Sequence, residues 1–410
     1  MFTSLSSVTY PVTDLNKAKQ WYGEMLGMNP VSETPLAVIF RIGDGMLALL
    51  PADKAPAEAC ERAVAYWNVE DIDAAFQRML DLGGTRHTDI YANAPGSRIA
   101  RVADPFGNIL GIISRSPAAR KSLDDQPSDS AMGVTLWRAL AAREERAELR
   151  GPDTLAEIFL TEDFRKLLND EASRDWIVRK MPGNLEFFLA RTLWFDTAFR
   201  EALRNGFPQI VLLGAGYDSR GWRFCDRLGG TRVFELDVAP TQQRKIRVLQ
   251  QANAPIPPQI VFVPVNFVRD RLEDVLRAAG FDRERLTLFL WEGVSYYLPG
   301  PSVEATLEFV RTNAPAGSLL CFDYMADAPD LHERYGVREA LDAMRATYLA
   351  EPVQFRLPEG TAESFLRERG FRVIEHLTEN EMEKMIVRPE GSPVGRMLAC
   401  FRLVKASPIP

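Results

Sequence analysis

Two glycines and two acidic residues, spaced by roughly twenty positions, carry the clearest chemistry in this sequence. Gly214 and Gly216 follow the apolar run QIVLL, and Glu235 and Asp237 lie at the end of the next apolar run, VFELD. Glycines let the backbone approach a ligand closely because they lack a Cβ atom. A carboxylate at the end of the next strand can accept hydrogen bonds from both ribose hydroxyls. The spacing predicts a nucleotide-type site, although a glycine turn without function has the same short pattern.

These residues need a scaffold of alternating strands and helices to bring them together. Five apolar runs read as strands: QIVLLG (209–214), TRVFELD (231–237), IVFVPVN (260–266), LTLFLWEG (286–293) and SLLCFDYM (318–325). Amphipathic segments such as 271–280 and 301–314 separate them, which predicts an α/β, doubly wound, mostly parallel sheet. The ligand of such a sheet binds at the carboxyl ends of the strands, where Gly214, Asp237, Asn266 and Glu292 lie. Two later runs, 371–377 and 397–406, predict an antiparallel hairpin at the sheet edge.

The motifs around these strands occur in a characteristic order. They are LARTLWFD, VLLGAGYDSRGWRF, VFELDVAPTQQRK, VPVNF and LFLWEGVSYYLP. In this order they resemble the leucine carboxyl methyltransferases, and among them the bacterial polyketide O-methyltransferases. The resemblance covers about residues 140–405 and implies a Rossmann-like class I methyltransferase fold, a helical cap within residues 136–199, and S-adenosyl-L-methionine as the cofactor.

The resemblance also implies roles for individual residues. Arg191 matches the arginine that pairs with the carboxylate of the methionine moiety, a task that suits a guanidinium. Asp237 matches the ribose-binding carboxylate, and Glu292 matches the acid at the methionine end. The glycine loop, which packs against the cofactor, supplies four more candidate residues: Gly214, Ala215, Gly216 and Asp218.

The sequence departs from the family pattern at the adenine. Asn266 and Phe267 stand where the family usually has Asp-Leu. An asparagine amide oxygen can still accept a hydrogen bond from the adenine amino group, but it does so without charge.

The methyl acceptor is expected near Tyr297, which matches a family tyrosine beside the substrate and is, with Glu292, the candidate catalytic residue. Further substrate candidates lie in and after the fifth strand: Tyr324, Arg334, Tyr335 and Arg338. A carboxylate acceptor is already ionised, whereas a phenol or an alcohol calls for a positioned base. The chain has only three dispersed histidines. The sequence therefore favours methyl-ester formation on a small molecule such as a polyketide, with a phenol or alcohol O-methyltransferase as the alternative.

The first 116 residues repeat one pattern twice: a strand, an amphipathic helix, then further strands. The segments VTDLNKAKQWYGEMLGM, VEDIDAAFQRMLDLGG and DPFGNILGI resemble the vicinal oxygen chelate family of glyoxalases and bleomycin-resistance proteins. This resemblance implies an α+β domain of paired βαβββ modules. Its metal-ligand positions fall, without gaps, on Ser7, Ala48, Val64 and Gly111, none of which is a usual ligand. We therefore expect no metal here.

Several roles remain open for this metal-free domain. It could bind substrate, cover the site as a lid, or serve only as a dimerisation surface. A binding cup would be lined by aromatic residues: Tyr10, Phe40, Tyr66 and Trp67. If these aromatics are ordinary core instead, which we slightly favour, the domain serves only as an interaction or dimerisation surface. In another alternative, the protein confers resistance and this cup sequesters a toxic metabolite.

The organisation expected is a domain over residues 1–116, a linker over 117–132 rich in Ser, Pro and charge, and a methyltransferase domain over 133–410. A net charge of −7 and the absence of a basic stripe argue against a nucleic-acid partner. No apolar run is long enough to cross a membrane, and no leader precedes the first domain, so we expect a cytoplasmic protein. Its expected partner is the small-molecule acceptor, and the resemblance leaves room for a homodimer.

Overall fold

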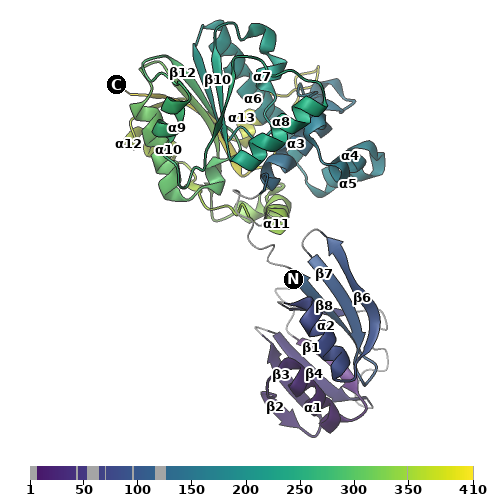
Figure 1. Cartoon of the computed structure of the whole chain (residues 1–410). Coiled ribbons are helices and arrows are strands. Elements are labelled where there is room, and N and C mark those ends of the chain that lie inside the picture. Colours follow the sequence, from purple (N-terminus) through teal and green to yellow (C-terminus); the bar gives the residue numbers. More distant parts are fainter. Residues whose placement is uncertain are drawn as a thin grey trace. The chain divides into compact units, whose positions relative to one another are not determined.

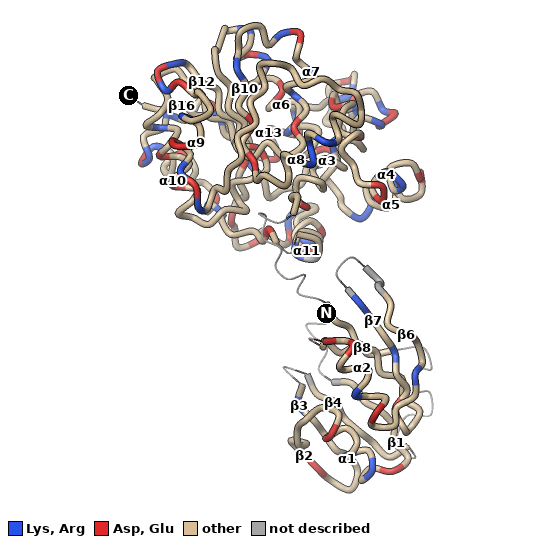
Figure 2. The backbone as a smooth tube through the Cα atoms, in the orientation of Figure 1, with Lys and Arg blue, Asp and Glu red and all other residues tan. Residues whose placement is uncertain are grey.

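An N-terminal unit, Met1–Arg120, and a C-terminal unit, Lys121–Pro410, make up the chain in this computed structural model (Figure 1). The structure describes residues 7–42, 45–52, 64–69, 71–94, 97–115, 126–348 and 350–409. Figure 2 shows that basic and acidic residues are mixed along both units. Among the described residues, no helix has the length and apolar character that a bilayer crossing requires.

The N-terminal unit consists of two βαβββ modules. The first contains β1 (Ser7–Val12), α1 (Leu15–Leu26), β2 (Ser32–Thr34), β3 (Ala37–Ile42) and β4 (Gly45–Pro51). The second contains β5 (Ala65–Asn68), α2 (Ile72–Asp81), β6 (Thr85–Ala94), β7 (Ser97–Ala103) and β8 (Ile109–Arg115). Their sheets have the matching orders β1-β4-β3-β2 and β5-β8-β7-β6. This confirms the paired-module fold.

Local signals in the sequence explain how the first module begins. Asp14 caps α1, and its carboxylate accepts hydrogen bonds from the backbone N–H groups of Asn16 and Lys17. Gly27 ends the helix with a φ of 68°, a conformation that glycine adopts without strain. In the second module, the Asp104 carboxylate accepts the N–H groups of Phe106 and Asn108 and so closes the turn between β7 and β8.

Three of the four aromatic residues expected to line a cup belong instead to the core of the N-terminal unit. Tyr10 and Phe40 are buried with Tyr22 of α1, and Trp67 packs against the same cluster. They lie on the faces of the sheets that the helices cover, because neighbouring strand residues point to opposite faces. Only Tyr66 fits the expected position.

The C-terminal unit has a central sheet with helices on both faces. Its strands are β9 (Gln209–Leu213), β10 (Arg232–Asp237), β11 (Ile260–Pro264), β12 (Thr287–Trp291), β13 (Leu319–Asp327), β14 (Leu357–Pro358), β15 (Phe371–Leu377) and β16 (Phe401–Pro408). The main path of the sheet is β11-β10-β9-β12-β13-β16-β15, and β14 pairs with β13. The pairs from β11 to β13 are parallel, whereas β16 is antiparallel to both β13 and β15. The predicted sheet and its antiparallel hairpin are confirmed.

The strand order places a ligand-binding crevice at β9. The chain runs from β9 outward to β10 and β11, and then crosses to the other side of β9 to form β12. The connections on either side of β9 therefore leave in opposite directions, which opens a crevice at the carboxyl ends of β9 and β12.

The helices that flank this sheet are α3 (Asp129–Ala142), α4 (Glu162–Asn169), α5 (Glu171–Lys180), α6 (Asn184–Arg204), α7 (Arg220–Arg223), α8 (Ala239–Gln251), α9 (Leu272–Ala278), α10 (Gly300–Thr312), α11 (Val337–Thr347), α12 (Ala362–Glu368) and α13 (Glu379–Glu383). Short 3-10 turns span Ala147–Leu149, Ala156–Phe159, Cys225–Arg227, Ser295–Tyr297 and Leu331–Glu333. One apolar cluster joins α3, α6 and α8 to one sheet face, and a second joins α9, α10 and α12 to the other.

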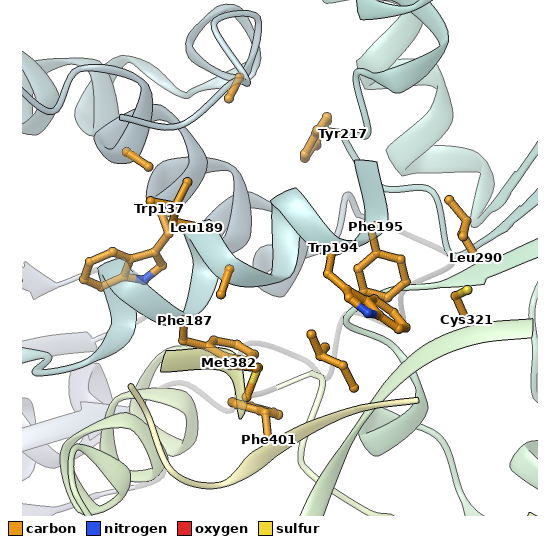
Figure 3. Close-up of a cluster of buried hydrophobic side chains, with 14 of the residues drawn as sticks. Trp137, Phe187, Leu189, Trp194, Phe195, Tyr217, Leu290, Cys321, Met382 and Phe401 are labelled. Atoms are coloured by element: carbon orange, nitrogen blue, oxygen red, sulfur yellow. The ribbon is translucent and has the colours of Figure 1, made fainter. Parts of the chain in front are cut away.

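Helix α6 is central to the first of these clusters. Figure 3 shows its side chains Phe187, Leu189, Trp194 and Phe195 beside residues that come from distant parts of the chain, such as Phe401 of β16. Phe187 and Phe401 stack with ring centroids 4.8 Å apart. The expected cap over residues 136–199 is thus helical, but its long helices α3 and α6 form part of the layer that packs on the sheet.

Two sequence-based boundaries need correction. Helix α3 begins at Asp129, with Ser128 as its N-cap, so the last residues of the predicted linker 117–132 are helical. Residues 116–125 of that region lie outside the described part of the chain. The helix expected directly after the glycine loop is only the short α7, which a 3-10 turn follows.

Candidate functional site

The glycine loop follows β9 and is hydrogen-bonded to the end of β10. The N–H groups of Gly214 and Ala215 both donate to the carbonyl of Leu236, at 2.9 and 2.7 Å. Gly214 has a φ of 78°, and a Cβ atom there would come within 2.4 Å of Val294 Cγ2. Gly216 has a φ of 48°. Packing against the protein itself therefore requires the glycine at 214, in addition to the approach of a ligand that the sequence predicted.

Asp237 lies at the end of β10, beside this loop. Its carboxylate accepts the N–H groups of Gly216 at 2.6 Å and Val238 at 2.8 Å. Burial raises the pKa of this carboxyl group to about 6, against the two backbone hydrogen bonds that lower it. The loop and the carboxylate are thus joined directly, as their spacing in the sequence indicated.

Arg191 of α6 reaches the carboxyl ends of β12 and β13. Its Nη1 donates to Asp323 at 2.9 Å, and its Nε lies 3.2 Å from a carboxylate oxygen of Glu292. Burial lowers the pKa of Arg191, but the charges of Asp323 and Glu292 outweigh this and raise it above its ordinary value. Asp323 also accepts the N–H of Gly293 at 2.6 Å. The structure therefore brings Arg191 and Glu292 together and adds Asp323, which the sequence argument did not identify.

Arg220 was also missed, although it lies within the AGYDSRGWRF motif. Its side chain is fully buried and contacts three carboxylates. It donates to Asp196 and Glu292, each at 2.8 Å, and to Asp218. Burial alone would raise the pKa of Asp218, but Arg220, Arg138 and Lys245 lower it to about 2. Asp218 is thus held ionised against Arg220.

A second buried cation from the helical region lies near Asp218. Arg138 of α3 is 6% exposed and lies 3.4 Å from Asp153. Ser219, next to Asp218, donates to the same Asp153 carboxylate at 2.6 Å. No periodicity or motif in the sequence separates Arg138 from its neighbours on α3.

Asn266 and Phe267 follow β11. The Asn266 side-chain oxygen accepts a hydrogen bond from the backbone N–H of Val268 at 3.0 Å. The backbone N–H of Asn266 donates to the Asp270 carboxylate at 2.7 Å. This side-chain amide therefore shapes a turn. Phe267 packs beside the cluster that joins α9 and α10 to the sheet.

Tyr297 lies among other tyrosines in the 3-10 turn after β12. Its ring is 4.7 Å from that of Tyr296 and 6.5 Å from that of Tyr348, centroid to centroid. Burial raises the pKa of all three phenols. Tyr348 lies close to Gly133, where a Cβ atom would clash with its hydroxyl. Aromatic rings from two separate segments therefore meet at Tyr297, beside the start of α3.

Glu351 holds the segment after α11 to the start of α3. It is 8% exposed and accepts hydrogen bonds from both the side chain and the N–H of Ser130, at 2.8 and 2.9 Å. The Ser128 hydroxyl donates to it at 2.8 Å. Its charge contributes to the raised pKa values of Asp237 and Tyr297, so this carboxylate lies between the two regions.

The structure does not bring the other substrate candidates to Tyr297. Tyr324 points to the sheet face opposite Asp323, where it is 1% exposed and its hydroxyl lies 3.0 Å from His376 Nε2. Arg334 is held by Asp330 and Glu359. The Arg396 guanidinium carbon lies 4.3 Å from the centroid of the Tyr335 ring. Arg338 is exposed. Tyr324, Arg334 and Tyr335 thus have other partners, and a substrate role for these four residues stays a prediction.

The donors and acceptors of this crevice fit the amino-acid end of S-adenosylmethionine. Among the described residues, Arg191 Nη2 is buried without a hydrogen-bond partner, and Glu292 Oε1 has only the ion-pair contact with Arg191 Nε at 3.2 Å. A guanidinium edge suits a carboxylate, and a carboxylate oxygen suits an ammonium group. Buried polar atoms are normally paired, so these two indicate a ligand that carries both groups.

Comparison with known proteins agrees with this geometry. A model described as leucine carboxyl methyltransferase matches residues 131–311, and one described as the glyoxalase/bleomycin resistance protein/dioxygenase superfamily matches residues 4–112. A protein of Streptomyces avermitilis named as an S-adenosyl-L-methionine-dependent methyltransferase is 32% identical over 234 residues, or 55% of this chain and 79% of the relative.

Two solved structures resemble the separate units. A duf574 family protein from Streptomyces avermitilis covers 69% of this chain and 99% of its own, with 13% identity and a TM-score of 0.46. A glyoxalase-related enzyme from Fulvimarina pelagi covers 28% of this chain and 88% of its own, with 22% identity and a TM-score of 0.26.

Proposed function

The chain belongs to the leucine carboxyl methyltransferase family of S-adenosylmethionine-dependent methyltransferases, and we propose that it forms a methyl ester on a carboxylate of a small organic acid. Its cofactor is S-adenosyl-L-methionine, which supplies an electrophilic methyl group. The family description supports the ester because it names a carboxyl group as the acceptor. A polyketide or another natural product is the class of acceptor that we propose.

We assign the cofactor-binding roles from the contacts around β9 and β12. Arg191 binds the carboxylate and Glu292 the ammonium group of the methionine moiety. Asp237 accepts the ribose hydroxyls, beside the loop of Gly214, Ala215 and Gly216. Asp218 is held against Arg220 and shapes this loop. Asn266 and Phe267 contact the adenine, and the Asn266 amide oxygen accepts a hydrogen bond from the adenine amino group.

The cluster of buried phenols around Tyr297, with ring centroids 4.7 Å from Tyr296 and 6.5 Å from Tyr348, is the observation that carries the ester proposal. A phenol is neutral near pH 7, and burial raises the pKa of all three further, so they act as hydrogen-bond donors. A neutral phenol is a poor general base, but it can orient an ionised carboxylate. The protein then needs only to hold the acceptor oxygen about 3 Å from the methyl carbon and to exclude water.

One contact favours the alternative acceptor, a phenol or an alcohol. Glu351 lies near enough to Tyr297 and Tyr348 to raise the pKa of both, and a carboxylate can act as a general base. Its two oxygens, however, already accept three hydrogen bonds from Ser128 and Ser130. The carboxylate is therefore already engaged in holding the start of α3, so we prefer the ester.

The alkali lability of the product separates the two reactions. The purified chain is incubated with methyl-labelled S-adenosylmethionine and a panel of aromatic and polyketide acids, each matched with its amide. We expect label to enter the acids and to be released as methanol by mild alkali. Alkali-stable label in a phenolic acid, equal in the amide, would show an ether and overturn the ester proposal. Tyr297→Phe should raise KM for the acid more than it lowers cofactor affinity.

For the N-terminal unit we propose a role in binding the acceptor, with a lid, a dimerisation surface or the sequestration of a toxic metabolite as the alternatives. Tyr66 supports a binding role because it is the one expected cup residue outside the helix-facing core. The expectation that this unit holds no metal stays a prediction.

A further inference from the structure

A row of paired residues crosses the sheet of the second βαβββ module. Tyr66 of β5 pairs with Gly111 of β8, Gly111 pairs with Arg101 of β7, and Arg101 pairs with Thr88 of β6. Residues paired across strands share a sheet face. The opposite face carries Ala100, Val102, Leu110 and Ile112, which pack with α2. The row therefore lies on the face that α2 leaves uncovered.

The register also shows which residue lies beside Gly111. Val64 precedes β5, and the residue that faces Gly111 is Tyr66, two positions later. A Cβ atom at Gly111 would lie 2.6 Å from the Tyr66 ring, so the glycine lets the ring rest on the strand. An aromatic ring thus occupies the space beside one of the expected ligand positions.

Arg101 and Tyr66 form a specific pair within this row. The Arg101 Nε–H donates to the Tyr66 hydroxyl at 2.6 Å, and the guanidinium carbon lies 5.7 Å from the ring centroid. Because the phenol oxygen accepts this proton, its own hydrogen remains available to a further acceptor. The Arg101 backbone N–H is bound by the Thr88 hydroxyl at 3.0 Å, which fixes the strand beneath the side chain.

The charge of Arg101 is not matched by an acid. Arg86 and Arg98 in the same module pair with Asp89 and Asp73, whereas no carboxylate in the described part of the chain lies within ion-pair distance of Arg101. Tyr66 and Tyr91 are the groups that raise its pKa. The Nη1–Nη2 edge of this guanidinium is therefore left without an acceptor among the residues that the structure describes.

We propose that Arg101 and Tyr66 form a binding site for the carboxylate of an aromatic or apolar organic acid. The guanidinium edge donates two parallel hydrogen bonds to the carboxylate, and the Tyr66 hydroxyl donates a third. The apolar body of the ligand lies against Ile113, which is partly exposed on this face. The site goes beyond the proposed methyl transfer and does not depend on which molecule is methylated.

Benzoate and its neutral isostere benzamide test the site in the full chain. Saturating S-adenosylhomocysteine occupies the cofactor crevice, and calorimetry measures the binding of each probe. We expect saturable benzoate binding and benzamide binding weaker by roughly tenfold or more, because charge-assisted hydrogen bonds are lost. Arg101→Gln should weaken benzoate binding by a similar factor, and Tyr66→Phe by roughly threefold to tenfold.

Arg41→Gln is the matched control. Arg41 lies in β3 with Ile39, on the face of the first module that its helix leaves uncovered, and it is exposed without a tyrosine paired beside it. Benzoate affinity should therefore be unchanged in this variant. If circular dichroism shows that Arg101→Gln does not fold, the benzoate affinity of Tyr66→Phe tests the site instead, because this variant keeps the ring over Gly111. Absence of saturable benzoate binding, equal binding of benzamide, or unchanged affinity in Arg101→Gln or Tyr66→Phe would overturn the proposal.

Discussion

At the scale of single residues, Arg220 has the largest expected effect on stability. It is the shared partner of Asp196, Asp218 and Glu292, and it is fully buried. Arg220→Gln leaves these carboxylates with too little positive charge, and removing one partner from a buried ion pair costs about 3–5 kcal/mol. We expect a loss of this size in the free energy of unfolding, measured by urea denaturation.

Arg227→Gln provides the comparison for this variant. Arg227 lies seven positions from Arg220, but its side chain is 63% exposed. Its ion-pair contact with Asp226 is a long one, 3.9 Å. A surface pair of this kind contributes little, so the free energy of unfolding should change by less than about 0.5 kcal/mol. Similar losses in the two variants would mean that the buried network does not stabilise the fold.

Asp237 predicts a pH dependence of cofactor binding. Its carboxyl has a pKa of about 6 in the folded chain, and only the ionised form accepts both ribose hydroxyls. Affinity for S-adenosylhomocysteine should therefore rise by roughly tenfold per pH unit below pH 6 and level off above it. Calorimetry between pH 5 and 8 measures this, and Asp237→Asn should flatten the profile. A flat wild-type profile would contradict the role of Asp237.

The same shift has the opposite sign for folding without cofactor. The folded-state pKa lies above the ordinary value of 3.8, so the folded chain binds this proton more tightly than the unfolded chain. The contribution of Asp237 to stability is therefore present at low pH and is lost as pH rises from 3.8 to about 6. Asp237→Asn should lack this decline in urea denaturation.

At the scale of elements, the loop between β9 and α7 depends on a close approach to the turn after β12. A Cβ atom at Gly214 would clash with Val294, whereas one at Gly229 would meet nothing within 4 Å. Both glycines have positive φ, 78° and 53°, so both alanine variants carry backbone strain. Gly214→Ala should lower the free energy of unfolding by about 1–3 kcal/mol more than Gly229→Ala, because overpacking adds to that strain.

A second substitution tests the cause of this difference. Val294→Ala in the Gly214→Ala background removes the methyl group that the new Cβ would strike, so part of the lost stability should return. Equal losses for the two glycine variants in urea denaturation would show that backbone strain alone sets the cost.

At the scale of the whole molecule, the two units have separate apolar cores. One cluster contains only residues of the N-terminal unit, and the other two contain only residues of the C-terminal unit. The residues assigned to the cofactor all lie in the second unit. Residues 121–410 expressed alone should therefore bind S-adenosylhomocysteine with the affinity of the full chain, measured by calorimetry. A large loss would mean that the first unit contributes to the cofactor site.

The sequence by itself determined the order of strands and helices and the local features that depend on near neighbours. The apolar runs of β9 to β13, the Asp14 cap and the glycine loop beside Asp237 follow from periodicity, side-chain type and spacing. These features depend on residues that are close in the sequence or on elements that repeat in order, so they can be predicted from the sequence alone.

Only the tertiary structure decided which residues share the buried site and which contact partners elsewhere in the fold. Arg191 meets Asp323, which is 132 positions away, while Arg334 is taken up by Glu359 and Tyr324 turns to the other sheet face. Charged side chains pair with whatever partner the packed elements bring near them, and the strand period of two decides which face each residue occupies. Neither outcome can be derived from one residue and its neighbours in the sequence.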